Sequence, residues 1–222
     1  MKQKQIFIVF SGIDGCGKTS ILNMVRDDLE KNGVKTSVQW LRFNHVLCKP
    51  LHAAARVLGL ARKQKMTEGG EWRHEFYRSP LFCKIYVWAT YFDTISGKKK
   101  AMRKARAEQC DVVICDRWIP DIIIDLAVKC RNNNLLHNAW SKRFLKLLPG
   151  NTLLLCITRP RQALLDCRAE NREDADFVFR LDQYEDWVQS GKTEVVRNDG
   201  TLEDAGNTAR NIANQFIKGI LK

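Results

Sequence analysis

One stretch near the N-terminus restricts the fold more than any other part of the sequence. Residues 12–19 read GIDGCGKT, which fits the phosphate-binding loop (P-loop) pattern G-x-x-x-x-G-K-[ST]. Such a loop lies between a buried strand and a helix, where its glycines let backbone N–H groups surround a phosphate and the helix N-terminus adds partial positive charge. Residues 6–10 form an apolar run typical of a buried strand, and apolar residues recur at helical spacing in 21–29. The context of the motif is therefore the one its chemistry requires.

The rest of the chain predicts an α/β fold. Four more short apolar runs indicate strands at residues 35–41, 111–115, 152–157 and 193–196. Helical patterns lie between and after them, at residues 46–62, 81–108, 120–131, 139–147, 161–169, 177–189 and 202–221. We expect a helix that begins at Glu71 to break or kink at Pro80. Short strands with long connections indicate a parallel sheet with helices on both faces, and 222 residues fit a single domain, 1–222.

Composition excludes several classes of protein. The hydrophobic fraction of 45% and the charged fraction of 28% are typical of a packed core rather than a disordered or fibrous chain. No apolar run approaches the ~20 residues that span a bilayer, and the polar N-terminus does not resemble a signal peptide, so we expect a cytoplasmic protein without a membrane span. The eight cysteines contain no C-x-x-C pair, which argues against a zinc module or redox dithiol and favours reduced thiols.

The net charge of +12 favours anionic partners, which include nucleotides, nucleic acid and acidic surfaces. Two stretches are especially basic. Residues 42–67 contain six basic and no acidic residues, and residues 98–106 read KKKAMRKAR. Solvated helix faces are the ordinary explanation for such stretches, and a direct role in binding is the alternative.

A second candidate site follows the predicted strand at 111–115. Residues 111–118 read DVVICDRW, so Asp116 and Arg117 stand at the strand's carboxyl end, where open parallel sheets bind their ligands. Asp116 is suited to hold the shell of a magnesium ion or to accept a proton from an attacking hydroxyl, and Arg117 to neutralise a phosphoryl group. In the P-loop, Lys18 would reach the outer phosphates and the Thr19 hydroxyl would bind magnesium. The alternative for Asp116 and Arg117 is a simple surface ion pair.

These motifs resemble those of the thymidylate kinases. The resemblance includes the P-loop with Asp14 at its third position, the triplet at 116–118, and residues 159–176 (RPRQALLDCRAENREDAD), which are similar to the family's arginine-bearing lid. Residues 196–203 are similar to its last strand and helix. The resemblance implies a three-layer P-loop kinase fold whose five-stranded parallel sheet has the order 2-3-1-4-5. It also implies Mg²⁺ as cofactor, ATP as phosphoryl donor and a nucleoside monophosphate as acceptor, with dTMP the first choice.

The resemblance further implies residue roles. The ATP-binding residues would be Gly12, Ile13, Asp14, Gly15, Cys16, Gly17, Lys18, Thr19 and Ser20. The acceptor would be bound by Asp14, Arg42 and Arg117, and the metal by Thr19 and Asp116. The catalytic residues would be Lys18, Asp116, Arg117, Arg168 and Arg172.

The two lid arginines, Arg168 and Arg172, are four residues apart, so we expect them on one face of a helical lid that closes over the transferring phosphoryl group. Because Cys16 stands at the P-loop position where some family members have an arginine, the transition-state cation should come from this lid. Ion pairs with Asp166, Glu173 or Asp176 are the alternative role for both arginines.

The chain departs from the family where the base would be read. Thr94, Asp121 and Leu126 replace the arginine, small residue and glutamine expected there. An aromatic residue would stack on the base or else belong to the core, and the candidates are Phe82, Trp88, Tyr91, Phe92 and Trp118.

These departures leave other functions open. One alternative is a kinase of a deoxynucleoside or of another phosphate-bearing small molecule. A nucleotide-gated nucleic-acid-binding protein ranks low, because the sequence contains no DNA- or RNA-binding module. The expected partners are ATP and a nucleotide acceptor, and formation of a homodimer stays open.

Overall fold

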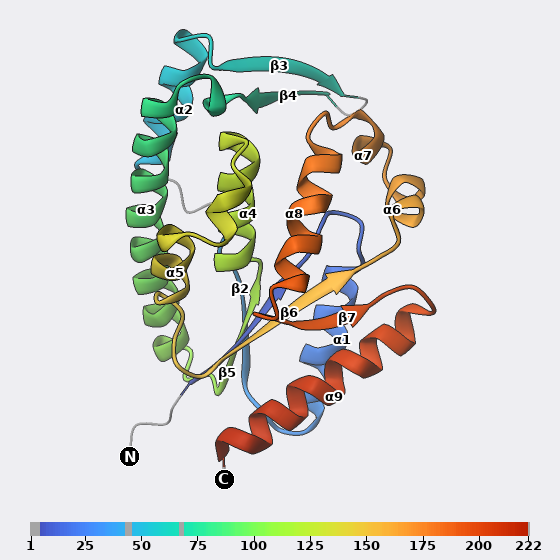
Figure 1. Ribbon diagram of the computed structural model, residues 1–222. Helices are drawn as coiled ribbons and strands as arrows, with labels where there is room; N and C mark the ends of the chain where they lie inside the picture. The colour runs from blue at the N-terminus through green and yellow to red at the C-terminus, as the bar shows by residue number, and fades with distance from the viewer. Residues whose placement is uncertain (1–4, 43–45, 67–68, 222) are drawn as a thin grey trace.

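The computed structural model describes residues 5–42, 46–66 and 69–221. At its centre is a five-stranded parallel sheet with strand order β2-β5-β1-β6-β7 (Figure 1). The strands are β1 (Ile6–Ser11), β2 (Thr36–Trp40), β5 (Val112–Asp116), β6 (Thr152–Thr158) and β7 (Glu194–Arg197). All six residues of β1 are buried, as expected for the central strand of a sheet covered on both faces. Numbered among themselves along the chain, these five strands have the order 2-3-1-4-5.

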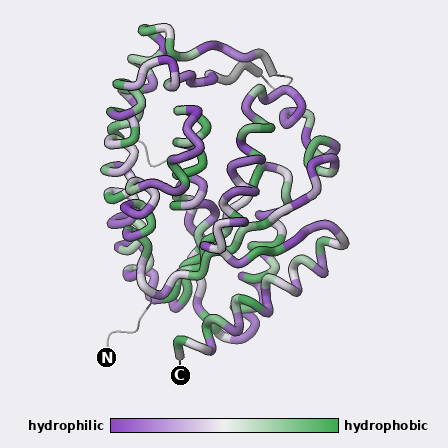
Figure 2. The backbone as a smooth tube through the Cα atoms, in the orientation of Figure 1, coloured by the Kyte–Doolittle hydropathy of each residue, from purple (hydrophilic) through white to green (hydrophobic). Residues whose placement is uncertain are grey.

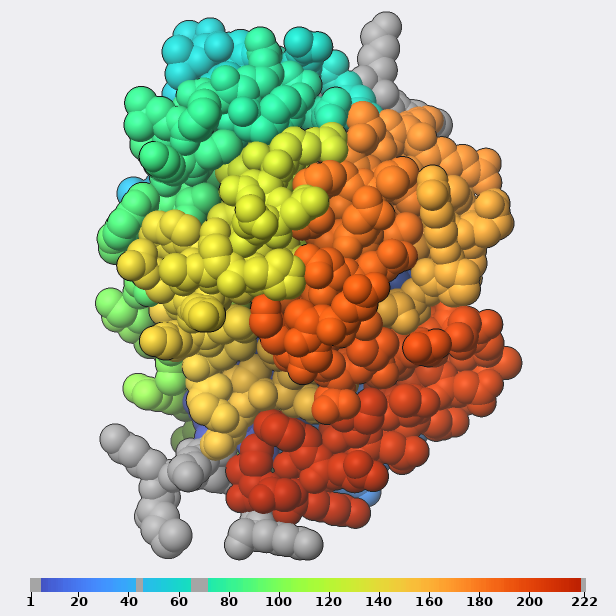
Figure 3. Space-filling model, in the orientation of Figure 1, coloured from blue at the N-terminus to red at the C-terminus, as the bar shows by residue number. Residues whose placement is uncertain are grey.

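Helices cover both faces of this sheet. On one face α1 (Lys18–Lys31) packs against α9 (Leu202–Leu221). The opposite face carries α3 (Pro80–Ala107), α4 (Ile119–Cys130), α5 (Ala139–Leu145) and α8 (Phe177–Gln189) (Figure 1). This division follows from right-handed connections between parallel strands. Apolar residues gather in the strands at the centre (Figure 2), and α4 and α8 lie against each other on the face shown in Figure 3.

The remaining elements are short. They are α2 (Cys48–Val57), β3 (Ala61–Met66), β4 (Gly69–His74), α6 (Arg161–Cys167), α7 (Ala169–Glu173) and two 3₁₀ turns, Phe76–Arg78 and Asn133–Leu136. The strand β3 pairs antiparallel with β4 from Ala61 opposite His74 to Met66 opposite Gly69. This two-stranded hairpin extends from α2 and α3 across to α7 (Figure 1).

The hairpin corrects the helix expected at residues 46–62. That helix ends at Val57, because Gly59 adopts the left-handed conformation (φ 68°) that commonly follows a helix C-terminus. The last two residues of the expected helix, Ala61 and Arg62, instead begin strand β3, which holds three of the six basic residues of the stretch 42–67. Residues 67–68 lie outside the described part of the chain.

The helix expected from Glu71 is also wrong. Residues 69–74 form β4, and Pro80 begins α3 rather than interrupting a longer helix. The Ser79 hydroxyl caps this helix by accepting a hydrogen bond from the Phe82 N–H at 3.3 Å, while proline at the first helical position needs no N–H partner.

Two further observations concern the chain as a whole. All eight cysteines are free thiols. None of the helices in residues 5–42, 46–66 and 69–221 has both the length and the apolar composition needed to cross a membrane.

Candidate functional site

The P-loop connects β1 to α1 at the carboxyl edge of the sheet, as its motif predicts. Gly12 has φ 144°, and a Cβ atom on it would lie 2.5 Å from the carbonyl oxygen of Ile157 in β6. Gly17 has φ 92°, and its Cβ atom would lie 2.6 Å from the amide nitrogen of Asn198. Both positions need glycine, because a larger residue would meet strained backbone geometry and a close neighbour.

Side chains from distant segments hold the P-loop from outside. The carbonyls of residues 14–16 accept, in order, hydrogen bonds from Asn171 (3.1 Å), Arg159 (3.0 Å) and Asn198 (2.9 Å). Sequence analysis missed these three residues, since their role depends on contacts with residues more than 140 positions away. The N-cap of α1 is Gly17, which offers no side-chain cap, and the first turn of α1 contains no acidic residue. The helix N-terminus is therefore suited to an external anion.

Asp116 and Arg117 lie at the carboxyl end of β5, beside β1. The Arg117 N–H donates to the Phe10 carbonyl at 2.9 Å, and φ of Arg117 is 64°, a left-handed conformation that costs about 1 kcal/mol for a non-glycine residue. One carboxylate oxygen of Asp116, Oδ1, is buried and has no hydrogen-bond partner among the described residues. An orphaned carboxylate oxygen fits the predicted role as a ligand of Mg²⁺ or of its water shell.

The other residues predicted to bind ATP differ in how far their side chains are exposed to solvent. Lys18 is buried at the start of α1, whereas the neighbouring Thr19 and Ser20 are exposed in the same helical turn. Cys16 is fully buried, and its burial raises the pKa of the thiol. Within the described residues, no three His, Cys, Asp or Glu side chains form a metal cluster.

Three arginines from separate segments surround the carboxylate of Asp14. Arg117 donates a hydrogen bond to Asp14 Oδ1, and the guanidinium nitrogens of Arg42 and Arg168 each lie 3.9 Å from a carboxylate oxygen. Burial alone would raise the pKa of Asp14, but Arg117, Arg42, Lys18 and Arg168 outweigh it and lower this pKa. The Asp14 side chain is 45% exposed, so these cations border solvent beside the P-loop. The arrangement is suited to bind a phosphate dianion.

The lid segment, residues 159–176, differs from the single helical face expected for Arg168 and Arg172. Arg168 has an extended backbone (φ −142°, ψ 116°) that separates α6 from α7, so the two arginines do not share a helix face. Only Arg168 is directed toward Asp14; Arg172 pairs with Asp166 at 2.9 Å, and both of those side chains are more than half exposed. The geometry of Arg172 therefore fits the alternative role in an ion pair better than the role of a catalytic lid residue.

Behind Asp14, two buried carboxylates orient the arginines. Asp125 accepts both Nε and Nη2 of Arg42 at 2.8 Å, and also Nη1 of Arg180 at 2.8 Å. Burial would raise the pKa of Asp125, but Arg42, Arg180 and Lys129 together lower it well below its usual value. Burial would lower the pKa of Arg42, but Asp125 raises it, so Arg42 stays charged.

Asp121 plays the corresponding part for Arg117. Its Oδ1 accepts Arg117 Nη1 at 3.0 Å and the Tyr184 hydroxyl at 2.7 Å. Burial would lower the pKa of Arg117, but Tyr184, Asp121 and Asp14 raise it. Asp121, which stands where the thymidylate kinases have a small residue, therefore holds Arg117 in place.

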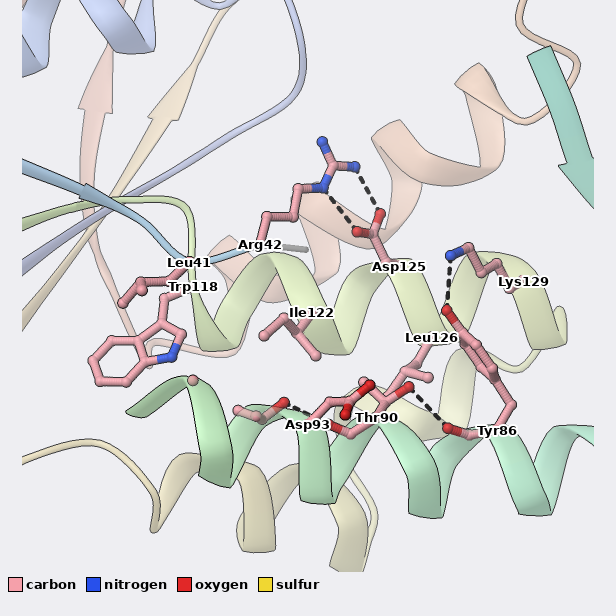
Figure 4. A pocket seen from close by; sticks show the side chains of 12 residues that line it. Leu41, Arg42, Tyr86, Thr90, Asp93, Trp118, Ile122, Asp125, Leu126 and Lys129 are labelled. Carbon is pink, nitrogen blue, oxygen red and sulfur yellow. Dashed lines mark hydrogen bonds and ion pairs between the residues drawn. The ribbon is translucent and has the colours of Figure 1, made fainter. Parts of the chain in front are cut away.

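A pocket opens between α3 and α4 next to this network (Figure 4). Its lining residues are Leu41, Arg42, Tyr86, Thr90, Asp93, Thr94, Gly97, Trp118, Ile122, Asp125, Leu126 and Lys129. Most of the polar groups on α3 are already bonded within the protein: the Thr90 and Thr94 hydroxyls donate to backbone carbonyls of α3 at 2.8 and 2.6 Å. The Asp93 carboxylate accepts the N–H groups of residues 46–48 at 2.9–3.0 Å and so fixes the start of α2.

Lys129, which sequence analysis missed, is the polar group at the far end of this pocket. Its ammonium donates to the Tyr86 hydroxyl at 2.9 Å, and His52 Nε2 lies 3.1 Å from the same hydroxyl. Figure 4 shows Lys129 and Tyr86 pointing toward each other from α4 and α3. Burial lowers the pKa of Lys129, although Asp125 opposes this effect. An ammonium has three donors, so Lys129 is equipped to bind an oxygen acceptor of a ligand.

Of the five aromatic residues expected to stack on a base, only Trp118 lines the pocket. Phe82 packs against Phe76, while Trp88 and Phe92 are exposed and stack on each other. Tyr91 contacts Phe144 edge to face.

No protein-family model matches this chain, and no curated protein matches its sequence.

Proposed function

We propose that this protein is a P-loop kinase that transfers a phosphoryl group from ATP to a nucleoside monophosphate. The observation that carries the proposal is the position of Arg42, Arg117 and Arg168, which surround Asp14 directly beside the P-loop. A P-loop alone would fit any nucleotide-binding protein. A second cluster of cations at the same sheet edge supports a second phosphate group, as the resemblance to thymidylate kinases implies.

In this proposal the protein acts mainly by positioning and charge stabilisation. The N-terminus of α1 and the buried Lys18 bind the phosphates of ATP. Arg42 and Arg117 hold the acceptor phosphate, each fixed by a carboxylate behind it. Arg168 stabilises negative charge on the transferring group, and Asp116 accepts the acceptor's proton or orients the metal shell.

Thr19 and Asp116 are the residues that would hold Mg²⁺, and the buried, unpartnered Oδ1 of Asp116 supports this role. Bound at the ATP phosphates, Mg²⁺ would neutralise charge that develops during transfer. Two protein ligands suffice, because Mg²⁺ in kinases binds substrate phosphates and several waters in addition.

The pocket between α3 and α4 bears on the identity of the acceptor. Thr90, Asp93 and Thr94 are engaged inside the protein, so the polar groups of the pocket suited to contact the rest of an acceptor whose phosphate Arg42 holds are chiefly Lys129 and Tyr86. This observation favours a second candidate in which the acceptor is a phosphate-bearing small molecule other than dTMP. We therefore expect an acceptor range that is broader than dTMP or displaced from it.

The test is ATP-dependent turnover, measured as kcat/KM for dTMP, dUMP, dCMP, dGMP, dAMP and unphosphorylated thymidine at equal magnesium and salt. Phosphorylation of one or more monophosphates is the expected result. Activity on thymidine alone would remove the acceptor-phosphate role from Arg42, and no turnover of any compound would contradict the proposal. Exclusive use of dTMP, by about 10³-fold or more, would show that other side chains rebuild a thymine pocket.

A further inference from the structure

The outer face of α3 exposes a row of large apolar side chains. Leu81, Ile85, Trp88 and Phe92 are spaced by four, three and four residues, so they lie on one side of the helix. Their exposed fractions are 68%, 44%, 49% and 50%. The rings of Trp88 and Phe92 stack with centroids 5.9 Å apart, which makes the row continuous over its second half. We refer to these four residues as the apolar row.

The helix α5 extends the same surface. The ring of Trp140 meets Trp88 edge to face with centroids 4.8 Å apart, and the guanidinium of Arg143 lies 4.9 Å above the Trp140 ring. In Figure 1, α5 lies beside α3 at the edge of the molecule. A cation, Arg143, therefore lies beside the apolar row, separated from Trp88 by the ring of Trp140.

Positive charge follows the apolar row along α3. Lys99, Arg103 and Arg106 continue at the same helical spacing and are exposed. Together α3 and α5 carry nine Lys and Arg residues, and their one acidic residue is Asp93, which is buried and bonded to the start of α2. This surface therefore joins exposed aromatic and aliphatic groups to positive charge, of which the nearby Glu108, just after α3, offsets Lys104 at 3.7 Å.

We propose that this surface of α3 and α5 docks the protein on an anionic lipid bilayer. Trp, Phe, Leu and Ile at one end suit the boundary between headgroups and acyl chains, and the Lys and Arg residues suit anionic headgroups. A second copy of the chain is a poorer fit, because like-charged residues such as Arg143 border the apolar row on both partners. A nucleic acid would contact the basic end but would leave the apolar row in water.

The experiment measures co-sedimentation of the full chain with vesicles of phosphatidylcholine alone and with about 30% phosphatidylserine. We expect at least about 10-fold more binding to the anionic vesicles, weakened by added salt. Two variants probe the two ends: Trp88→Gln with Phe92→Gln, and Lys99→Gln with Arg103→Gln and Arg106→Gln. Each should reduce binding about 10-fold or more, because stable anchoring needs both signals.

The matched control removes three exposed cations that lie outside α3 and α5, at the end of α1, at the end of β7 and in α9: Lys31→Gln, Arg197→Gln and Lys218→Gln. It loses the same net charge and should bind nearly as wild type does. Circular dichroism and thermal melting establish that each variant folds. Equal binding to both vesicle types, an equal loss in the control, or no binding overturns the proposal. So does a dimer in light scattering that Trp88→Gln and Phe92→Gln dissociate while vesicle binding is unchanged.

Discussion

The P-loop and the pocket between α3 and α4 lie side by side but are built differently. The P-loop presents backbone groups from eight consecutive residues, and distant side chains only hold its carbonyls in place. The pocket presents side chains from α3, from α4 and from the residues just after β2, and its charged groups are oriented by other buried charges, as Asp125 orients Arg42. A backbone site is therefore specified by local sequence, whereas the pocket depends on residues up to 83 positions apart.

This difference predicts different consequences of mutation. At the P-loop, removing one functional cation should lower the rate of phosphoryl transfer and leave the fold intact, because no buried charge loses its counterion. In the pocket between α3 and α4, removing the carboxylate that orients an arginine leaves a buried charge without its partner. Such a change should also lower the free energy of unfolding. The following predictions test this contrast, from the largest expected effect to the smallest.

Lys18→Ala should lower kcat/KM by about 10³-fold or more, because a cation that contacts the transferring phosphates acts on the transition state. Asp116→Ala should also abolish turnover. Unfolding of either variant in urea should match that of wild type. Lys31→Ala, at the exposed far end of α1, is the matched control and should retain full activity. Near-wild-type turnover by Lys18→Ala or Asp116→Ala would contradict the kinase proposal.

Asp125→Asn should lower the free energy of unfolding by about 3 kcal/mol at pH 7, because Arg42 and Arg180 lose their shared counterion. The pKa of Asp125 is lower in the folded protein than in the unfolded chain. Its contribution is therefore complete above about pH 4 and is lost as the pH falls further.

Urea unfolding of wild type and Asp125→Asn at several pH values measures this dependence. The difference between the two proteins should shrink below about pH 4, because there Asp125 begins to be protonated in the unfolded chain while the folded protein still holds it ionised. A constant difference down to pH 2 would show that the carboxylate charge is not what stabilises this half of the site.

Arg168→Ala should lower kcat about 10²-fold and leave the dissociation constant of ATP nearly unchanged, since this arginine faces the reacting groups beside Asp14. Arg172→Ala is its matched control in the same lid segment. Because Arg172 forms an exposed pair with Asp166, its removal should cost less than about 5-fold, equivalent to 1 kcal/mol. The reverse ranking would restore the helical lid face that the sequence predicted.

Lys129→Met should have the smallest effect, an increase of about 10-fold in KM for the acceptor with little change in kcat. The ammonium lies at the far end of the pocket from Arg42 and would contact bound acceptor equally in the ground and transition states. Steady-state kinetics with the best acceptor of the panel measures it, with Lys31→Met as control. A fall in kcat without a change in KM would place Lys129 nearer the chemistry.

Sequence reasoning identified the P-loop half well because each part of it has a local signature. The glycine pattern, the apolar run before it and the helical spacing after it predicted β1, the loop and α1 within a residue or two. The strand at 111–115 likewise placed Asp116 and Arg117 at the sheet edge. The resemblance added Arg42, whose role as an acceptor-binding residue stays a prediction.

It failed where a role depends on contacts across the chain. Nothing in the sequence around Asp93 indicates that its carboxylate caps α2, because that helix begins 45 residues earlier. The helical spacing of Arg168 and Arg172 was misleading, because the Asn171 side chain bonds both Asp14 and Leu164 carbonyls and stands just after a break between α6 and α7. The hairpin was missed because its strands are basic and polar, without the apolar alternation that indicates a strand.

The sequence by itself determined the parallel sheet, the position of the P-loop and the strand end that carries Asp116 and Arg117, since apolar periodicity and glycine placement act over a few residues. Only the tertiary structure decided which charges meet: that Asp14 binds Arg117, that Asp125 binds Arg42 and Arg180, and that Lys129 reaches Tyr86. The physical reason is that a buried charge is stable only beside its partner, and that partner is supplied by packing of distant elements rather than by neighbours along the chain.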